Sequence, residues 1–306
     1  MATGIVAASV VGFPDAPSLT TPASLPPLTH RVCPILERPT KTKVLNFAPA
    51  PWVLKQCLET GLVYLENPPE YNELQENFAW EVTTQQEAKR RAAAEPVSYA
   101  LRSRWKRFRC RYFWRDKIGS LTADCLTRAG NGQLTLLEPG CAWGGNLKHV
   151  MELLSPKVAA RCIPVGIEIS KKLAAYCDQR LQPFGGTCHY DNALSGMNRL
   201  PANSVDAIIL CSYLEHEVNP LPTLRCCREA LRADGRIIIK VPNFDCLSRR
   251  LRGRRWCGFR WPDHVNYFTP QTLQALAAAA GFQIARMNWL DHHPLSDNMY
   301  AVLKKA

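Results

Sequence analysis

The stretch LTLLEPGCAWGGN, residues 134–146, joins a short apolar run to a glycine-rich turn. Leucines make up the apolar run, as expected for a buried strand, and a helix is predicted to begin near Asn146. The turn between them contains Gly140, Gly144 and Gly145, which allow the backbone to bend sharply and to approach a ligand closely. The stretch therefore predicts a ligand-binding turn after the first strand of an α/β domain.

An apolar run and a further predicted strand each lead into acidic residues, and the positions of these residues indicate the ligand. Residues 163–167 lead into Glu168, about 24 residues beyond the glycine turn, close to the offset of roughly 20 residues at which a carboxylate binds ribose hydroxyls. Residues 187–190 lead into Asp191 and Asn192, where a carboxylate can accept a hydrogen bond from the adenine amino group. Both acidic positions favour a cofactor that contains adenosine.

Adenosine occurs in dinucleotides and in S-adenosylmethionine, and the turn discriminates between them. A dinucleotide requires G-x-G-x-x-G, whose glycines let the pyrophosphate contact the backbone. This chain has G-x-x-x-G-G, with Ala142 in place of the second glycine and Asn146 after the glycine pair. S-adenosylmethionine carries no phosphate and tolerates such a turn, so it is the expected cofactor.

A series of motifs extends this interpretation from residue 100 to residue 303. In order, they are LLEPGCAWGGN, VGIEIS, YDNALS, VDAIILCSYLEH, LRADGRIIIKVPN and HVNYFTPQTLQALAAAAGF. The set resembles class I S-adenosylmethionine-dependent methyltransferases, and within them the bacterial small-molecule and sugar methyltransferases. The resemblance implies a Rossmann-like, doubly wound α/β fold with a seven-stranded sheet. Ala142 departs from the usual E/D-x-G-x-G-x-G, and we expect weaker cofactor affinity at most.

The expected cofactor-binding residues follow the carboxyl ends of the strands, where ligands of open α/β sheets bind. They are Glu138, Gly140, Cys141, Ala142, Trp143, Gly144, Glu168, Ile169, Asp191, Asn192, Cys211 and Ser212. The last two end the apolar run 205–211, which is typical of a central strand buried on both faces. Trp143 either lies against the donor or fills the gap between turn and helix.

Methyl transfer to a hydroxyl group requires removal of a proton, and two histidines are candidate bases. His216 directly follows the fourth apolar strand, and His264 ends the long connection that starts at Pro242. For each, a structural role is the alternative. Asp263, Asn266 and Tyr267 flank His264 and either hydrogen-bond a polyol acceptor or hold the connection in place.

Glu215 and His216 also resemble part of the E-x-x-E-H metal site of quinone-biosynthesis O-methyltransferases. Ser212 occupies the position of the first glutamate, so we expect no bound metal and a structural role for Glu215. The strand lacks the N/D-P-P-Y/F sequence that is associated with methylation of exocyclic base amines. Nucleic-acid N-methylation is therefore disfavoured.

Composition places the 306 residues among globular chains, with 46% hydrophobic and 21% charged residues. No apolar run approaches the roughly 18 residues of a membrane helix. Thirteen cysteines, scattered singly and without a secretory leader, indicate a reducing compartment, and we expect a cytoplasmic protein. Residues 1–30, rich in Pro, Ser, Thr and Ala, are predicted to be a disordered tail. A transit peptide is the alternative, but such peptides are Arg-rich.

Residues 31–80 resemble the small zinc ribbon that precedes the catalytic domain in many sugar methyltransferases. Cys33 and Cys57 match the first cysteine of each zinc knuckle, but Leu36 and Thr60 occupy the second positions. Two thiolates cannot complete a four-ligand structural site. We therefore expect a degenerate, metal-free lobe that packs beside the catalytic domain and covers the acceptor.

Basic charge is concentrated in two stretches that account for the formal net charge of +12. Residues 81–130 are a predicted helical lead-in to the catalytic domain, residues 131–306, and their segment 101–117 carries eight Lys or Arg among aromatics. Residues 248–260 add six arginines. We rank a phosphorylated or carboxylated small-molecule acceptor first, a solvated basic face second and RNA third.

These observations predict an enzyme that transfers a methyl group directly to oxygen on a small polar or anionic acceptor such as a sugar, a nucleotide sugar or a hydroxylated metabolite. One alternative is an RNA or protein methyltransferase that uses the basic stretches. The other is a non-catalytic scaffold with a methyltransferase fold. Acidic residues at the ends of three successive strands argue against the scaffold, because only cofactor binding requires them.

Overall fold

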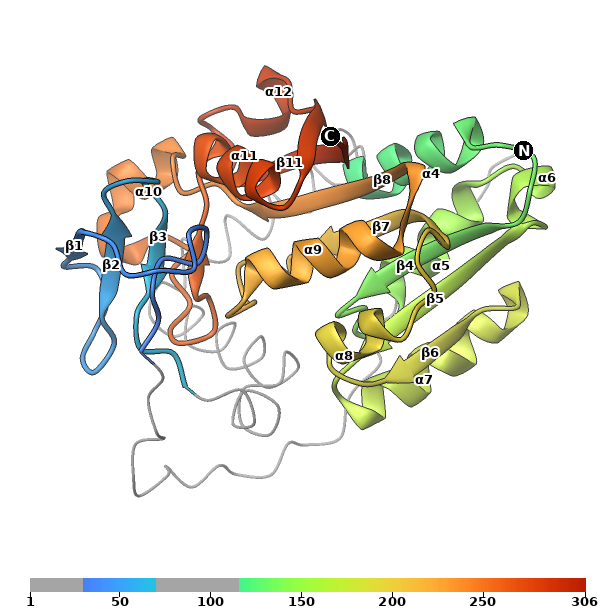
Figure 1. The fold of residues 1–306 in the computed structure, drawn as a ribbon, viewed down its shortest axis with the longest axis horizontal. Coiled ribbons are helices and arrows are strands. Elements are labelled where there is room, and N and C mark those ends of the chain that lie inside the picture. The colour runs from blue at the N-terminus through green and yellow to red at the C-terminus, as the bar shows by residue number, and fades with distance from the viewer. Residues whose placement is uncertain (1–29, 70–115) are drawn as a thin grey trace, which may run out of the picture.

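The computed structural model describes residues 30–69 and 116–306 (Figure 1). Most of the predicted tail and of the basic helical lead-in lies outside these ranges. The described residues form a seven-stranded sheet with helices on both faces and a four-stranded sheet near one end of the molecule. Among them, no helix is both long and apolar enough to cross a membrane.

The large sheet has the strand order β10-β11-β8-β7-β4-β5-β6. Its strands are β4 (Leu134–Pro139), β5 (Cys162–Glu168), β6 (Thr187–Tyr190), β7 (Val205–Cys211), β8 (Leu231–Pro242), β10 (Phe282–Arg286) and β11 (Asn298–Lys305). Strands β4 to β8 are parallel, whereas β11 is antiparallel to both of its neighbours. The predicted doubly wound, seven-stranded α/β fold is confirmed. The strand order reverses beside β4, where such sheets bind their ligands.

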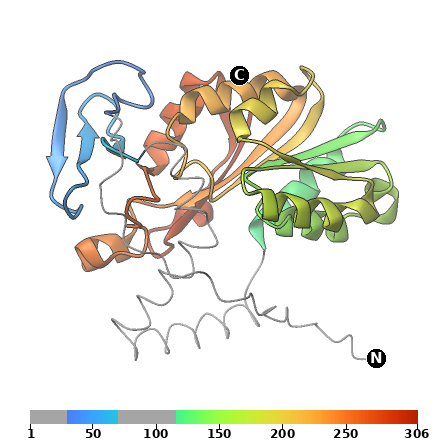
Figure 2. The same cartoon turned by 90° about the horizontal axis from the view of Figure 1, so that it is seen from below.

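Helices cover both faces of the large sheet (Figure 2). On one face lie α4 (Lys117–Arg128), α5 (Gly145–Leu153) and α7 (Lys171–Leu181), and on the other α8 (Ala193–Asn198), α9 (Pro220–Ala230) and α11 (Pro270–Ala279). Strand β7 directs Ala207 and Ile209 into the core beneath α4, α5 and α7. Ile208 and Leu210 point into the core beneath α8, α9 and α11, because successive side chains of a strand lie on opposite faces. Its predicted burial on both faces is confirmed.

The sequence predicts a helix over residues 171–181 with Ser170 as its cap. Helix α7 has these bounds, because Ser170 accepts a hydrogen bond from the backbone N–H of Leu173. Helix α11 is capped in the same way by Thr269, which forms a capping box with Thr272. The remaining helices and 3-10 turns are short. They are α6 (Pro156–Ala159), η1 (Gln182–Phe184), α10 (Leu247–Arg252), η2 (Gly253–Arg255) and α12 (Trp289–His292).

The sequence predicts strands over residues 236–241 and 282–290, and the structure differs from both predictions. The strand expected over residues 282–290 stops at Arg286, because Asn288 and Asp291 form a capping box that starts α12. The strand expected over residues 236–241 is longer, since β8 already begins at Leu231 and includes the Ala-Asp-Gly segment.

The small sheet contains β1 (Thr42–Leu45), β2 (Leu54–Cys57) and β3 (Val63–Leu65), and its fourth strand comes from the catalytic part of the chain. This fourth strand, β9 (Asn266–Tyr267), pairs antiparallel with β3. The lobe predicted over residues 31–80 is therefore not self-contained, because the connection that carries His264 completes its sheet.

Candidate active site

The glycine turn takes left-handed backbone conformations at three positions. Gly140 has φ +66°, Gly144 has φ +72°, and Ala142 between them has φ +48°. A Cβ on Gly140 would lie 2.8 Å from the ring of Tyr213, and one on Gly144 would lie 2.7 Å from the Sγ of Cys177. The two glycines are thus required both by their conformation and by their close neighbours.

Ala142 adopts the backbone conformation for which the usual motif has glycine. For an alanine, the left-handed region costs roughly 1–2 kcal/mol. A hydrogen bond opposes this cost, because the N–H of Ala142 donates to Oε2 of Glu168 over 2.8 Å. The missing glycine therefore leaves the shape of the turn intact and adds strain to it.

Glu138 is the penultimate residue of β4 and is only 2% exposed. Nδ2 of Asn146 donates to its Oε1 over 2.6 Å, and among the described residues its Oε2 has no hydrogen-bond partner. Burial raises the pKa of Glu138 to about 8. A buried acceptor without a partner is unusual, and its place beside the turn suits the ammonium group of an amino-acid tail.

Glu168 ends β5 directly opposite the turn, as predicted. Its Oε2 accepts the hydrogen bond from Ala142, and its Oε1 accepts one from the N–H of Ser170 over 2.9 Å. The carboxylate, which is 7% exposed, is therefore fixed in orientation by two backbone groups. A carboxylate has about four acceptor positions, so this arrangement is compatible with ribose hydroxyls as further donors.

Asp191 and Asn192 follow β6, as predicted, and have different local roles. The N–H of Asn192 donates to Oδ1 of Asp191, whose carboxylate also forms an ion pair with Arg199. The side chain of Asn192 caps α8 by accepting from the N–H of Ser195 over 2.9 Å. Only the carboxylate therefore has the chemistry to contact adenine directly, and Arg199 is a neighbour that the sequence did not reveal.

The other predicted cofactor residues surround the same edge of the sheet. Trp143 lies over Gly145, where a Cβ would come within 2.7 Å of its indole nitrogen. Ser212 has φ +55°, and its Oγ accepts a hydrogen bond from Nζ of Lys240. Burial raises the pKa of Cys211 to about 11, which keeps it protonated. Ile169 follows Glu168 and is partly exposed.

These residues fit S-adenosylmethionine. The tight turn and the acceptor Glu138 match the amino-acid tail of the cofactor. The carboxylate of Glu168 matches its ribose, and that of Asp191 matches its adenine. The protein would hold the cofactor by Glu138, Glu168 and Asp191.

The two candidate histidines lie against each other at the carboxyl end of β7. The centroids of the His216 and His264 rings are 4.7 Å apart, and the rings are nearly perpendicular. The Nδ1 of His216 lies 3.0 Å from Oδ1 of Asp263, which also forms an ion pair with Arg260. The sequence singled out both histidines, but it did not predict that they would touch.

Their environments separate the two rings chemically. Burial disfavours the charged form of His216, but the carboxylate of Asp263 outweighs this effect and raises the pKa of His216 above its ordinary 6.5. His264 is 4% exposed, and its Nδ1 lies 2.7 Å from the carbonyl oxygen of Gly258. Burial, reinforced by His216, lowers the pKa of His264 well below 6.5, so this ring is neutral. His216, whose side chain is 23% exposed, is the more accessible base.

Glu215 extends this group. Its carboxyl group is 1% exposed, and burial raises its pKa. One ligand atom each from Glu215, His216 and His264 lies within 4.8 Å of the others, close enough for the three to share a metal ion. The Nδ1 atoms of both histidines are directed at protein oxygens, so Nε2 would be the ligand atom.

Asn266 and Tyr267, proposed above as acceptor contacts or loop supports, hold the loop. The Nδ2 of Asn266 donates to the carbonyl oxygens of Leu214 and Glu217. The hydroxyl of Tyr267 donates to the backbone carbonyl oxygen of His264. Both side chains are nearly fully buried. They fix the His264 segment against the loop that carries His216.

Arg31, which no motif indicated, links the small lobe to this loop. Its guanidinium donates to the carbonyl oxygens of Leu65, Val218 and Val265 and to Oδ1 of Asn266. Burial lowers the pKa of Arg31 to about 10, a value at which the group stays charged. A single side chain thereby connects the lobe, the β7 loop and β9.

The two lobe cysteines, Cys33 and Cys57, are both buried next to Thr60. The Oγ1 of Thr60 lies 3.6 Å from the Sγ of Cys33, and the backbone N–H of Thr60 donates to the Sγ of Cys57 over 3.5 Å. The residue that replaces a knuckle cysteine therefore contacts both thiols through hydrogen bonds.

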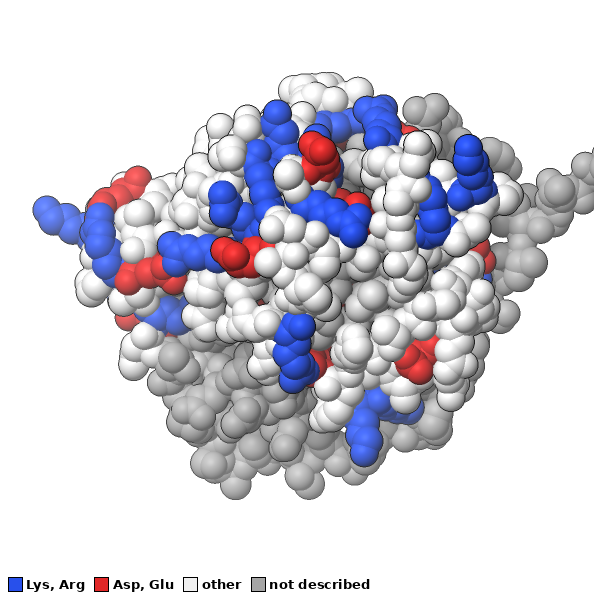
Figure 3. All heavy atoms as spheres, turned by 45° about the vertical axis from the view of Figure 1, so that its right-hand side comes forward, with Lys and Arg blue, Asp and Glu red and all other residues white. Residues whose placement is uncertain are grey.

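On the face shown in Figure 3, Lys and Arg side chains are interspersed with Asp and Glu. The second basic stretch is partly bound into the fold, since Arg249 stacks on the ring of Phe244, Arg250 pairs with Asp245 and Arg254 donates to a lobe carbonyl. These contacts favour a structural role for this stretch. The first, residues 101–117, lies almost wholly outside the described residues.

A family model described as "Methyltransferase domain" matches residues 105–286. Relatives include the ubiquinone biosynthesis O-methyltransferase of Cereibacter sphaeroides, 27% identical over 171 residues, which are 53% of this chain and 66% of the relative. The enzyme of that name from Cupriavidus pinatubonensis is 23% identical over 175 residues, 55% of this chain and 68% of the relative. The matched segment spans just under two thirds of the Cereibacter protein.

Similarity to solved structures is looser. The CurJ carbon methyltransferase superposes with a TM-score of 0.49 at 13% identity and covers 62% of this chain and 54% of its own. Geranyl diphosphate methyltransferase in complex with GPP and sinefungin gives 0.47 at 14% identity, over 61% and 75% of the two chains. By the family match, together with its sheet order and glycine turn, the chain belongs to the class I S-adenosylmethionine-dependent methyltransferases.

Proposed function

We propose that the protein catalyses O-methylation of a small hydroxylated acceptor, with S-adenosylmethionine as the donor and His216 as the base. The His216–Asp263 pair at the carboxyl end of β7 carries this proposal. The names of the two O-methyltransferase relatives support oxygen as the methylated atom.

The bound cofactor supplies a methyl group already activated on sulfur, so the protein's tasks are alignment and proton removal. With Nδ1 of His216 donating to Asp263, the basic nitrogen is Nε2. The carboxylate of Asp263 stabilises the imidazolium that forms when Nε2 takes the acceptor proton. The buried, neutral ring of His264 packs edge-on against His216 and keeps it in place.

The turn and the histidine loop are in direct contact, which supports their use in one reaction. The ring of Tyr213, three residues before His216, packs over Gly140 so closely that a side chain there would collide with it. The hydroxyl of Tyr213 donates to Glu217, just beyond His216, over 2.6 Å. Tyr213 therefore fixes the distance between the donor turn and the base.

Charges next to the loop favour an acceptor that bears phosphate or carboxylate. Lys240 on β8 donates to Oγ of Ser212 at the start of the loop, and Arg260 pairs with Asp263 at its other side. Asp263 offsets the charge of Arg260, so Lys240 is the group that would attract an anion to this site. Nucleotide sugars and hydroxylated carboxylic acids are therefore the first acceptors to test.

Calorimetric titration with S-adenosylmethionine, and separately with its demethylated product, tests the donor. We expect saturable binding of one molecule per chain. Assays with methyl-labelled donor and a panel of nucleotide sugars, hydroxylated acids and catechols should then yield a methyl ether, identified by mass spectrometry and NMR. Transfer to nitrogen or carbon alone would contradict the proposal, and no donor binding by the folded protein would favour the scaffold.

A further inference from the structure

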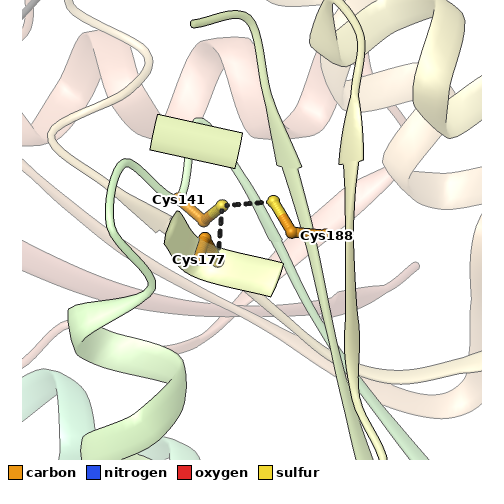
Figure 4. A group of neighbouring side chains, drawn as sticks. All are labelled: Cys141, Cys177 and Cys188. Carbon is orange, nitrogen blue, oxygen red and sulfur yellow. Dashed lines mark hydrogen bonds between the residues drawn. The ribbon is translucent and has the colours of Figure 1, made fainter. Parts of the chain in front are cut away.

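Three cysteines from three separate elements meet beside the cofactor turn (Figure 4). Cys141 lies in the turn, Cys177 in α7 and Cys188 in β6. The Sγ of Cys141 is 3.5 Å from the Sγ of Cys177 and 3.5 Å from that of Cys188, and all three sulfurs lie within 4.8 Å of one another. The sequence has these cysteines scattered singly along the chain, so their spacing did not predict the cluster.

The fold leaves room for the sulfurs at one position of β5. A Cβ on Gly166 would lie 2.6, 3.0 and 3.2 Å from the Sγ atoms of Cys141, Cys188 and Cys177. Real Cβ atoms essentially never make a contact as short as the first of these, and the other two are tight, so a side chain at this position would displace the sulfurs. The neighbours of Gly166 in β5, Val165 and Ile167, are buried apolar residues.

The spacing of the sulfurs distinguishes metal binding from a disulfide. Thiolates bind zinc at about 2.3 Å, which places two of them about 3.8–4.0 Å apart on a tetrahedral or trigonal centre. The two sulfurs of a disulfide are about 2.05 Å apart. The observed separations of 3.5 Å are within a few tenths of an ångström of the first arrangement and far from the second.

The three thiols differ in their access to solvent. Cys141 and Cys177 are fully enclosed, whereas Cys188 is partly exposed and provides an approach from solvent.

We propose that Cys141, Cys177 and Cys188 form a binding site for a soft, thiophilic metal ion of the zinc or monovalent copper type. Sulfur ligands select such ions over magnesium and calcium. Three Sγ atoms form the metal–sulfur bonds, and the thiol protons are released to solvent as the bonds form. No redox step is involved.

Titration of the reduced, metal-free, full-length protein with Zn²⁺, with Cu⁺ held in a competing chelator, and with Mg²⁺ tests this site. We expect one Zn²⁺ or Cu⁺ per chain and no Mg²⁺ at the same concentration. Co²⁺, as a spectroscopic substitute for zinc, should give the charge-transfer bands of thiolate ligands. In the wild-type protein, bound metal should also protect Cys188 from alkylation, as measured by peptide mass spectrometry.

Substitutions locate the ion. Cys188→Ser should weaken metal binding by more than about 100-fold, because losing even an outer partner of a ligand costs about 10–100-fold. Cys57→Ser and Cys226→Ser, which remove thiols outside the cluster, should leave it unchanged. Unchanged affinity in folded Cys188→Ser, loss in Cys57→Ser, or equal alkylation of Cys188 with and without metal in the wild type would each overturn the proposal.

Discussion

The donor side and the acceptor side of the candidate site are built in opposite ways. On the donor side, left-handed residues of one turn and the carboxylate of the adjacent strand are held by backbone hydrogen bonds within about 30 residues. On the acceptor side, His216 depends on Asp263, which is 47 residues away, and its loop depends on Arg31, which is 187 residues from Val218. Local sequence specifies the first side, and tertiary structure assembles the second.

If the two sides have separate tasks, substitutions on the acceptor side should lower kcat, and substitutions on the donor side should weaken binding of S-adenosylmethionine. The largest effect is expected on the acceptor side. His216→Ala should lower kcat by about 10²–10⁴-fold, the usual contribution of a general base. The dissociation constant of S-adenosylmethionine should stay the same in calorimetry. His149→Ala is the matched control, because His149 also pairs with an aspartate, Asp116, but away from the loop. Full turnover in His216→Ala would transfer the role to His264 or to no base.

Arg31→Met should show how strongly the acceptor side depends on the lobe. The methionine keeps the apolar stem but removes the guanidinium that donates to the carbonyls of Leu65 and Val218 and to Asn266. The carbonyl of Val265 keeps its hydrogen bond from the N–H of Leu65. We expect the free energy of unfolding to fall by about 2–4 kcal/mol, since each unsatisfied buried group costs about 1–3 kcal/mol and such costs are not additive. Urea denaturation measures this change. Arg38→Met, which removes an exposed pair with Glu59, should have a much smaller effect.

Glu168→Gln should affect the donor side alone. An amide offers one acceptor oxygen, so Ala142, Ser170 and the ribose compete for it. Donor binding should weaken by about 10–100-fold, equivalent to one or two lost hydrogen bonds to a charged group. At saturating donor, kcat should be nearly unchanged. An equal loss of kcat and affinity would mean that the two sides are coupled. Glu152→Gln, at an exposed position of α5, is the control.

Asp263→Asn should move the pH dependence of kcat. The carboxylate raises the pKa of His216, and a base works only when neutral, so wild-type activity should fall as the pH drops through this raised value. Without the negative charge, the pKa of His216 decreases, and the acidic limb of the profile should shift to lower pH. If the acidic limb of the profile did not shift, Asp263 would not set the pKa of the base. Asp116→Asn, in the other His–Asp pair, should leave the profile in place.

The smallest effect is expected at Ala142. Ala142→Gly relieves a left-handed alanine, worth roughly 1–2 kcal/mol, but gives the unfolded chain about 0.4–1 kcal/mol of additional entropy. The melting temperature should therefore rise slightly. Ala278→Gly, on the exposed face of α11, should lower it, because glycine inside a helix costs about 0.5–1 kcal/mol. If both substitutions lowered the melting temperature, Ala142 would not be strained.

The same contrast explains what the sequence could predict. Strand β7 and helix α7 have the predicted bounds, because an apolar run and a capping serine are local signals. The sulfur cluster and the His216–Asp263 pair unite residues 36 to 47 positions apart through the parallel crossovers of the sheet. Spacing along the chain does not show which of these residues meet.

Strand β9 completes the small sheet from a distant part of the sequence, which has a consequence for synthesis of the chain. Val265, beside β9, accepts a hydrogen bond from Arg31, which precedes it by 234 residues. At about 5–20 residues per second, the ribosome needs roughly 10–50 s to produce this partner after the lobe has emerged. Strand β3 has an unpaired edge during that interval, so a chaperone that binds extended segments would protect the nascent chain there.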